Sequence, residues 1–148
     1  MRRVFIIRKD LHLKPGKLAA MVGHCCEAYW TNLLKKMSVD NVVEVLDNDQ
    51  TFRFKVDIPK DIWTQYVLGI FTKTICEARN RNQLLKAEAL AKEQGLAEGL
   101  DYGYINDKCL TDLEPENPDG TCTVGIWFKP LPDETAHAIS KKFPLYRD

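Results

Sequence analysis

The fold is decided by residues 4–26, which read VFIIRKDLHLKPGKLAAMVGHCC. The first four residues form a continuous apolar run flanked by charge, which is typical of a strand buried on both faces of a sheet. A polar loop follows, and Gly16-Lys17 opens a helix that is expected to run to about Lys36. The predicted core stripe of this helix, at helical spacing, is Leu18, Val22, Cys25, Tyr29 and Leu33. A buried strand that leads into an amphipathic helix indicates the α/β class.

Strands and helices alternate along the rest of the chain. Strands are expected at 42–46, 52–56, 71–76, 102–105 and 121–128, and helices at 61–68, 81–94 and 134–142. This order predicts one domain over residues 1–148, with a mixed, mostly parallel sheet that carries helices on both faces. The two strands within residues 38–58 are interpreted as a hairpin added after the first helix.

The composition is that of a globular protein without a membrane span. Hydrophobic residues make up 45% of the chain and charged residues 28%. No apolar run approaches the roughly 20 residues that cross a bilayer, and the run at 4–7 is too short for a signal peptide. The five cysteines include no CxxC pair and no Cys/His spacing suited to zinc. Reduced thiols, a cytoplasmic location, no metal and no membrane partner are therefore expected.

The net charge is zero, but the charge is unevenly distributed. Residues 1–36 contain eight basic and two acidic residues, so they carry +6 and the remainder of the chain carries −6. A basic end of this kind is compatible with a nucleic-acid partner on one face. On charge alone, the favoured reading is a solvated surface with charges of both signs.

The strongest local chemical signal is Lys14-Pro15-Gly16-Lys17, between the first strand and its helix. Backbone N–H groups at a helix start attract anions, and Lys17 adds a full positive charge there. The segment is not a Walker A loop, since Leu18 follows the lysine. His24 lies two turns further on and can share a face with Lys17. The alternatives are a lysine that points into water and a histidine that is simply packed.

A second group of polar residues follows the strand at 102–105. Asp107 and Thr111 lie just after this strand, at the start of a long loop. A carboxylate at a strand end can orient water or a lysine, although Asn106-Asp107 is also ordinary turn chemistry. Thr121 and Thr123 are compatible with a plain strand. The acidic stretch 112–119 is expected to be solvated. A nucleophilic cysteine paired with His24 is a weaker alternative, because neighbouring residues on a helix do not face each other.

Four blocks of sequence resemble the Pth2-type peptidyl-tRNA hydrolases, in family order and over nearly the whole chain. The first follows the family patterns R-x-D-L and G-K-[IVL]-A-A, and the third is similar to I-x-D-A-G-x-T-Q. The blocks are Arg8–Leu11 with Gly16–Ala20 and Gly23-His24; Lys73–Cys76 with Ala91–Leu96; Ile105–Thr111; and Gly120–Ile126 with Pro130–Glu134.

The resemblance implies hydrolysis of the ester that joins a peptide to the 3′ ribose of tRNA. The implied partner is therefore tRNA, and no metal or organic cofactor is implied. Carried over by motif, Lys17, Asp107 and Thr123 form the catalytic centre, with His24 close by. The residues implied to bind substrate or tRNA are Arg8, Lys9, Lys14, Thr111 and Thr121.

The chain departs from the family patterns at three positions. Met21 replaces a glutamine, Cys109 replaces the glycine of the D-A-G turn, and Asp112 replaces a second glutamine. The loop that ends at Gly120 is also longer and acidic, so it is expected to repel tRNA if it lies near the site. These departures leave a second reading open, a catalytically inactive module of the same fold that binds RNA or protein. An uncovered edge of the hairpin also leaves a homodimer open.

Overall fold

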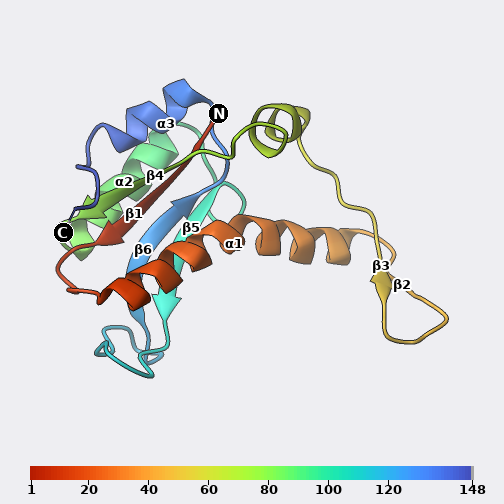
Figure 1. Ribbon diagram of the computed structural model, residues 1–148, viewed down its shortest axis with the longest axis horizontal. Helices are drawn as coiled ribbons and strands as arrows, with labels where there is room; N and C mark the ends of the chain where they lie inside the picture. The colour runs from red at the N-terminus through yellow and green to blue at the C-terminus, as the bar shows by residue number, and fades with distance from the viewer. Residues whose placement is uncertain (148) are drawn as a thin grey trace.

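The computed structural model describes residues 1–147, and four strands form its main sheet (Figure 1). Across the sheet the strands are β4 (Lys73–Ala78), β1 (Arg3–Arg8), β6 (Cys122–Phe128) and β5 (Tyr102–Asp107). β1 pairs parallel with β4, whereas β1–β6 and β5–β6 are antiparallel. The sheet is mixed as expected, but antiparallel pairs outnumber parallel ones. The reason is that β5 and β6 are consecutive strands joined by a loop, without a crossover helix.

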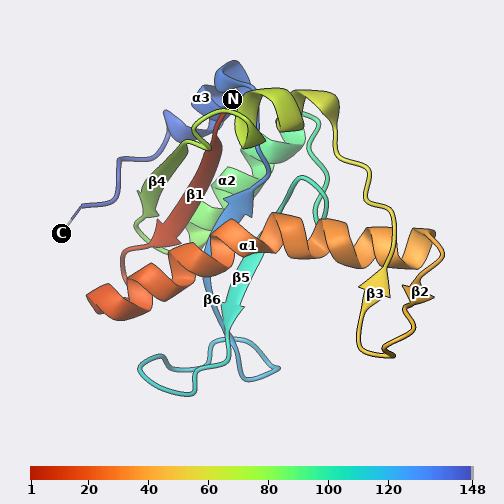
Figure 2. The same cartoon turned by 45° about the vertical axis from the view of Figure 1, so that its right-hand side comes forward.

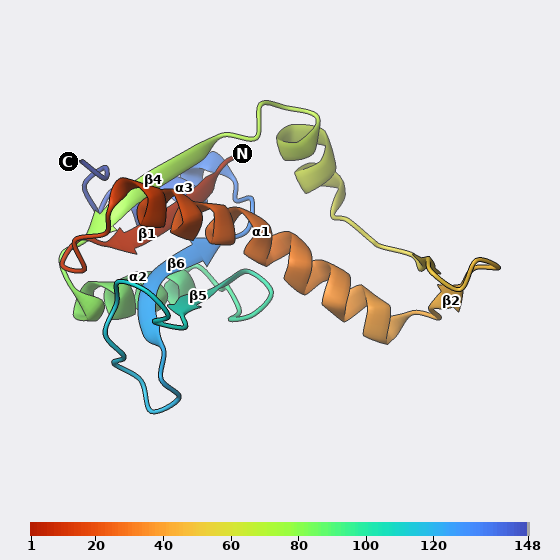
Figure 3. The same ribbon diagram turned by 60° about the horizontal axis from the view of Figure 1, so that its bottom comes forward.

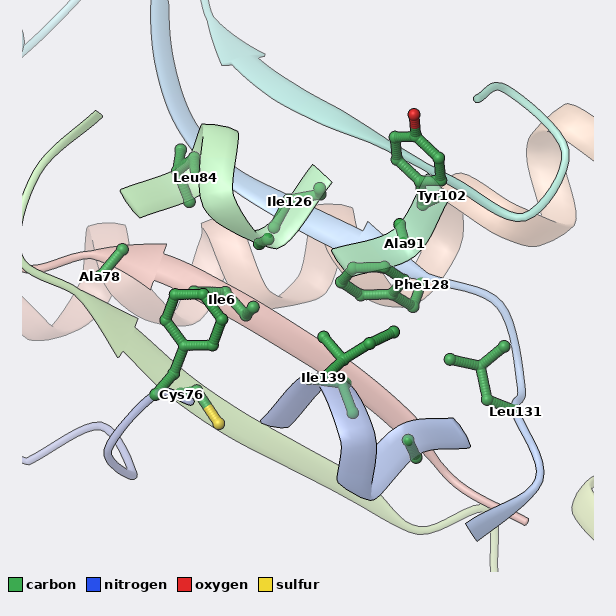
Figure 4. Packing of buried hydrophobic residues seen from close by; sticks show 14 residues of the cluster. Ile6, Cys76, Ala78, Leu84, Ala91, Tyr102, Ile126, Phe128, Leu131 and Ile139 are labelled. Carbon is green, nitrogen blue, oxygen red and sulfur yellow. The ribbon is translucent and has the colours of Figure 1, made fainter. Parts of the chain in front are cut away.

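Helices cover both faces of this sheet, as expected. β1 alternates between two cores: Phe5 and Ile7 pack with α1 (Pro15–Asp40), while Val4 and Ile6 face the opposite layer. That layer consists of α2 (Arg81–Glu93) and α3 (Asp133–Ser140), which contribute Leu84, Ala91 and Ile139 to the core shown in Figure 4. The apolar run of β1 is continuous because both of its faces are buried.

The first helix is longer than expected and buries a slightly different stripe. α1 continues one turn beyond Lys36, to Asp40. Its fully buried residues are Met21, Cys25 and Tyr29, whereas the predicted core residues Leu18 and Val22 are only half-buried. Consequently Met21 lies in the core between α1 and the sheet.

Arg3 ties the helix to the sheet through a completely buried guanidinium group. It donates hydrogen bonds to the carbonyl oxygens of Phe128, Cys25 and Cys26, at 2.9, 2.9 and 2.7 Å. The guanidinium carbon lies 4.8 Å from the centre of the Phe5 ring. Burial lowers the pKa of Arg3, and the three carbonyl bonds compensate for part of the lost hydration.

The segment between α1 and β4 first extends away from the sheet and then packs back onto the α1 core through Ile62. It contains a hairpin of β2 (Glu44–Val45) and β3 (Phe52–Arg53), followed by the single π-helical turn η1 (Ile62–Val67). The hairpin is confirmed, but its strands are two residues long because no layer covers their side chains. Figures 2 and 3 show it at the far end of α1 from the sheet. Whether it is an insertion stays a prediction.

The remaining predicted elements are present with shifted ends. β4 begins at Lys73, and β5 continues to Asp107 because its pairing with β6 runs past an irregularity at Ile105/Asn106. Asn80 caps α2 by accepting a hydrogen bond from the backbone N–H of Gln83, at 3.2 Å. Among the described residues, no helix combines the length and apolarity that crossing a bilayer requires.

Candidate functional site

The site is built where α1 begins, beside the end of β5. Lys14 precedes the helix, Pro15 occupies its first turn, and no acidic residue or side-chain cap neutralises that turn. The first turn of a helix leaves backbone N–H groups without intrahelical partners, and Pro15 removes only one of them. The start of α1 therefore presents a positive end, reinforced by the charges of Lys14 and Lys17.

Lys17 and Asp107 form the central contact of the site. The Lys17 Nζ atom donates a hydrogen bond to Asp107 Oδ2 at 2.7 Å, although the two residues are 90 positions apart in the sequence. Their side chains are 18% and 11% exposed, so the pair is shielded but can be reached by solvent. The other oxygen of Asp107 accepts a hydrogen bond from the backbone N–H of Cys109 at 2.9 Å. Each carboxylate oxygen retains a lone pair that can accept a hydrogen bond from water.

These contacts hold Asp107 in its ionised form. Desolvation by burial raises the pKa of this carboxyl group, but the hydrogen bond from Lys17, the backbone bond from Cys109 and the charges of Lys17 and His24 together outweigh it. The net effect lowers the pKa of Asp107. A carboxylate with a lowered pKa is a weak proton acceptor at neutral pH and is better suited to orienting a cation or a water molecule.

The turn after Asp107 is held in a conformation that normally selects glycine. Cys109 has φ of 55°, in the left-handed region, and its Sγ atom donates to the carbonyl oxygen of Asp107 at 3.5 Å. This conformation directs the N–H of Cys109 onto the Asp107 carboxylate. The backbone conformation of the turn thus helps to fix the position of the Asp107 carboxylate.

His24 lies on the exposed face of α1, two turns after Lys17. Its charge is one of the contributions that lower the pKa of Asp107, which places it in the surroundings of the pair. The structure gives His24 no packed environment of the kind expected for a core histidine. It is available to a ligand that lies along α1.

Arg8, which the resemblance implies to bind substrate or tRNA, is buried in this structure. Its guanidinium group is 4% exposed and makes five hydrogen bonds: two to Asp10, two to Glu116 and one to the carbonyl oxygen of Thr123. The Glu116 bonds raise the pKa of Arg8 and lower that of Glu116. All five N–H groups of an arginine are therefore occupied. In this structure Arg8 ties the 108–121 loop to β1 and β6, and its predicted contact with tRNA stays a prediction.

Lys9 and Lys14, which the resemblance also implies to bind substrate or tRNA, lie in different surroundings. Lys9 contacts the chain end: its Nζ atom donates to the carbonyl oxygen of Arg147 and lies 4.5 Å from the centre of the Tyr146 ring. Lys9 therefore fastens the C-terminal segment that borders β4. Lys14 is 75% exposed, beside the helix start, and lies 3.3 Å from Asp112. Only Lys14 of these two lies beside the Lys17–Asp107 pair.

A family model described as Peptidyl-tRNA hydrolase PTH2 matches residues 1–146. The chain belongs to this family. A protein named peptidyl-tRNA hydrolase, from Methanopyrus kandleri, is 29% identical over 146 residues, which covers 99% of this chain and 98% of that relative. The resemblance drawn from the four sequence blocks is thereby confirmed, and the PTH2 assignment covers the whole of the main sheet and its helices.

The departures from the PTH2 patterns leave the Lys17–Asp107 contact in place. Met21 is 1% exposed and belongs to the core, so its thioether does not face the site. Cys109 keeps the left-handed turn that the missing glycine would adopt freely. Asp112 adds a negative charge to the loop, and Lys14, whose Nζ atom lies 3.3 Å from it, offsets part of that charge.

Thr123 lies on another side of the sheet from Lys17. Its Oγ1 atom donates to Asn106 Oδ1 at 2.8 Å and accepts from Asn117 Nδ2 at 3.1 Å. It lines a hollow of about 490 Å³ whose other wall comes from α2, including Leu84. Lys17 instead reaches Asp107 from α1. The predicted three-residue centre is therefore divided in this structure between two faces of the β5–β6 end.

The other predicted threonines belong to the loop. Thr121 bonds through Oγ1 to Asp119 at 2.6 Å and to Asn117 at 3.0 Å, so it stabilises the turn that leads into β6. Thr111 is exposed. The acidic stretch was predicted to be solvated, but two of its side chains have partners in the protein. Glu116 is paired with Arg8, and Asp119 with Thr121. Pairing explains how an acidic loop can lie beside a cationic site.

Sequence reasoning missed the residues that anchor this loop. Leu113 is 8% exposed and packs into the α1 core, while Glu116 and Asn117 join it to β1 and β6. Leu113 is an apolar residue flanked by the acidic residues Asp112 and Glu114. That isolated position was the available sequence signal for an anchor. Arg8, which makes two hydrogen bonds to Glu116, lies 108 positions away in the sequence, so the pair leaves no local pattern.

The cysteines do not support a thiol enzyme. Burial raises the pKa of Cys25 to about 12 and those of Cys76 and Cys122 to about 11. Nucleophilic cysteines require a lowered pKa. In residues 1–147 all five thiols are free, and no group of three or more His, Cys, Asp or Glu side chains is arranged to hold a metal ion.

Proposed function

We propose that this chain hydrolyses the ester bond of peptidyl-tRNA, releasing the peptide and free tRNA, in the cytoplasm. The observation that carries the proposal is the 2.7 Å contact between Lys17 and Asp107 at the positive start of α1, within a chain of the PTH2 family. The same activity is named for the Methanopyrus kandleri relative. No organic cofactor or metal is needed for this reaction.

In the proposed reaction a water oxygen adds to the ester carbonyl carbon. The carbonyl oxygen becomes an oxyanion, which Lys17 stabilises from the side of α1. The bond between the carbonyl carbon and the ribose oxygen then breaks, the ribose oxygen takes up one proton of the attacking water, and the other proton of that water is released to solvent. The products are a peptide carboxylate and a free ribose hydroxyl group. Electrostatic stabilisation of the developing oxyanion is usually the largest single contribution to the rate enhancement of such enzymes.

Asp107 has the role of holding Lys17 and the attacking water. Its pKa is lowered, so we assign it to orientation rather than to removal of the proton. The backbone bond from Cys109 fixes the carboxylate plane, and the free lone pairs of the carboxylate accept from water. His24 on α1 and Lys14 just before its first residue are both exposed, and they are proposed to contact the phosphates or ribose of the tRNA end.

Thr123 is proposed to act through position. Its hydroxyl group links Asn106, the neighbour of Asp107, to Asn117 of the loop. Loss of that link is expected to loosen the end of β5 and thereby move the Asp107 carboxylate. Thr123 is therefore a positioning residue in this proposal, and Thr121 and Thr111 shape the loop around it.

The test is release of N-acetyl-amino acid from N-acetyl-aminoacyl-tRNA. Wild type is expected to turn over, and Lys17→Ala is expected to lose about two to three orders of magnitude in kcat/KM, as for removal of one oxyanion donor. Lys129→Ala is a matched control, because Lys129 pairs with Asp101 at the same 2.7 Å with comparable side-chain exposure. Salt-sensitive binding of tRNA without turnover by wild type would contradict the proposal and favour the inactive module.

A further inference from the structure

The hollow of about 490 Å³ beside α2 is a second candidate for contact with the substrate. α2 forms one wall, and Tyr104 of β5 and Pro118 of the 108–121 loop contribute to the others. Its volume lies within the range of about 300–1,000 Å³ that is usual for small-molecule sites. Thr123, which also lines it, is only 7% exposed. A concave surface of this size, lined by apolar groups and a few fixed polar groups, has the form of a ligand subsite.

The hollow and the Lys17–Asp107 pair lie on two sides of one strand end. Asn106 lines the hollow, whereas its neighbour Asp107 accepts the hydrogen bond from Lys17. Adjacent Cα atoms are about 3.8 Å apart, and successive side chains of a strand point to opposite faces. β5 is an outer strand of the four-stranded sheet that residues 1–147 form. A single ligand that passes around this outer edge can therefore contact both places.

Apolar and aromatic side chains give the hollow walls that suit a flat ligand. They are Leu84 and Leu85 from α2 and Tyr104 from β5. The hydroxyl group of Tyr104 donates a hydrogen bond to Glu88, and that of Tyr102 donates to the same carboxylate at 3.1 Å. These bonds hold the Tyr104 ring in place. A planar group can pack against a ring that is already ordered without the entropic cost of ordering it.

A hydrogen-bond network orients the polar groups of the hollow. Asn117 donates through Nδ2 to the hydroxyl oxygens of Thr121 and Thr123, at 3.0 and 3.1 Å, so its Oδ1 atom is left as an acceptor. Arg81 donates to that Oδ1 atom at 2.8 Å, and one of its lone pairs remains. Asn106 accepts from Thr123 at 2.8 Å, and its Nδ2 group donates to no group within residues 1–147. The hollow thus offers one amide donor and one amide acceptor.

Charge decides which part of a nucleotide can occupy the hollow. The charged residues that line it are Arg81, Glu88 and Asp119, which sum to −1. Arg81, the cation among them, also lies 3.7 Å from Glu116. A lining with a net negative charge repels a phosphate group and accepts a neutral ring that carries N–H donors. The occupant that fits is therefore a neutral heterocycle with an amino group.

We propose that the hollow binds the adenine base of the last tRNA nucleotide, whose ribose carries the ester. This inference rests on the proposed hydrolase function, because it requires that the ester lies at Lys17 and Asp107. The terminal base is attached to that same ribose, so it lies within a few bonds of the ester. It passes around the edge of β5 and packs against Leu85. Its amino group donates to Asn117, and an adjacent ring nitrogen accepts from Asn106, as asparagine amides recognise adenine elsewhere.

The first experiment titrates the full chain with adenosine and with inosine, followed by amide NMR shifts. Inosine has the same ring shape but an oxygen in place of the amino group. Adenosine is expected to shift the resonances of Leu85 and Asn117 and to bind at least about fivefold more tightly than inosine. Leu85→Ala should weaken adenosine about fivefold through lost apolar contact, and alanine is favourable in a helix. Leu34→Ala is the matched control, since these helical leucines are 45% and 53% exposed, and it should bind like wild type.

The second experiment compares hydrolysis of two N-acetyl-aminoacyl esters, one on the 3′ oxygen of adenosine and one on ribose without a base. Wild type is expected to favour the adenosine ester at least about tenfold in kcat/KM. Leu85→Ala should narrow that ratio, whereas Leu34→Ala should keep it. Equal rates on the two esters would overturn the inference and leave the hydrolase function standing.

The binding titration keeps the two proposals distinguishable. If wild type hydrolyses neither ester nor N-acetyl-aminoacyl-tRNA, the proposed function fails, and the titration still decides whether the hollow binds adenine. Equal affinity for adenosine and inosine, or resonance shifts confined to residues outside the hollow, would overturn the inference whether or not the esters are hydrolysed.

Discussion

Replacement of Arg8 by methionine decides whether this arginine holds the loop or binds tRNA. The change removes five hydrogen bonds and keeps an apolar stem of similar length. The buried carbonyl oxygen of Thr123 loses the hydrogen bond from the Arg8 guanidinium group. Leaving this acceptor unpaired costs about 1–3 kcal/mol of folding stability. Asp10 and Glu116 are each about one-third exposed and can be rehydrated, so their lost bonds add less than those of a sealed ion pair. We expect the free energy of unfolding to fall by about 2–4 kcal/mol.

The effect of Arg8→Met should depend on pH. The folded-state pKa of Glu116 is lowered by Arg8, so the stability that this pair contributes is present above the unfolded pKa of glutamate, about 4.3. It is lost as the pH falls through the lowered folded pKa. The difference between wild type and Arg8→Met is therefore expected to be full at pH 7 and to shrink below about pH 4.

The assay is urea unfolding at both pH values, with tRNA binding measured in parallel. Arg79→Met serves as the control, because Arg79 is exposed and lies in the turn just after β4, whose last residue pairs with Arg8. We expect the control to leave stability nearly unchanged. Loss of tRNA affinity in Arg8→Met without loss of stability would refute the structural role and restore the prediction made from the family motif.

Three further changes test the surroundings of the site. Cys109→Gly should stabilise the fold by about 0.5–1 kcal/mol, since glycine adopts the left-handed conformation without strain, and thermal unfolding would detect it. Leu113→Ala should cost about 2–3 kcal/mol and speed amide hydrogen exchange in residues 108–121, where unchanged exchange would mean that Leu113 does not anchor the loop. Iodoacetamide at pH 7 should leave Cys25 and Cys122 unlabelled in mass spectra, because their raised pKa values keep them as thiols; rapid labelling of either would contradict their burial.

Local patterns predicted most of the fold. The apolar run at 4–7 predicted β1, and the helical spacing of apolar residues after Gly16 predicted α1, because both patterns lie within a short stretch of sequence. The pairing direction of the sheet was predicted less well, since strand order depends on contacts between distant segments. The hairpin within 38–58 was recognised, but its strand lengths were overestimated because no core covers them.

The candidate site was predictable only in part for the same reason. Family motifs pointed to Lys17 and Asp107, which contact each other across 90 positions. The roles of Arg8 and Glu116 were not predictable, because a charged residue in a sequence does not reveal its partner 108 positions away. Arginine is usually exposed, and only the folded structure shows that Arg8 is buried and connects the 108–121 loop to β6.

The most direct test of the account is a double-mutant cycle of Lys17→Met and Asp107→Asn in the hydrolysis of N-acetyl-aminoacyl-tRNA. If the pair acts as one unit, each single variant loses about two to three orders of magnitude in kcat/KM, and the double variant loses little more than either. The side-chain stem and the shape of the carboxyl group are kept, so circular dichroism should show folded protein in all four cases. Additive losses, or full activity in either single variant, would contradict the claim that Lys17 and Asp107 together form the working centre.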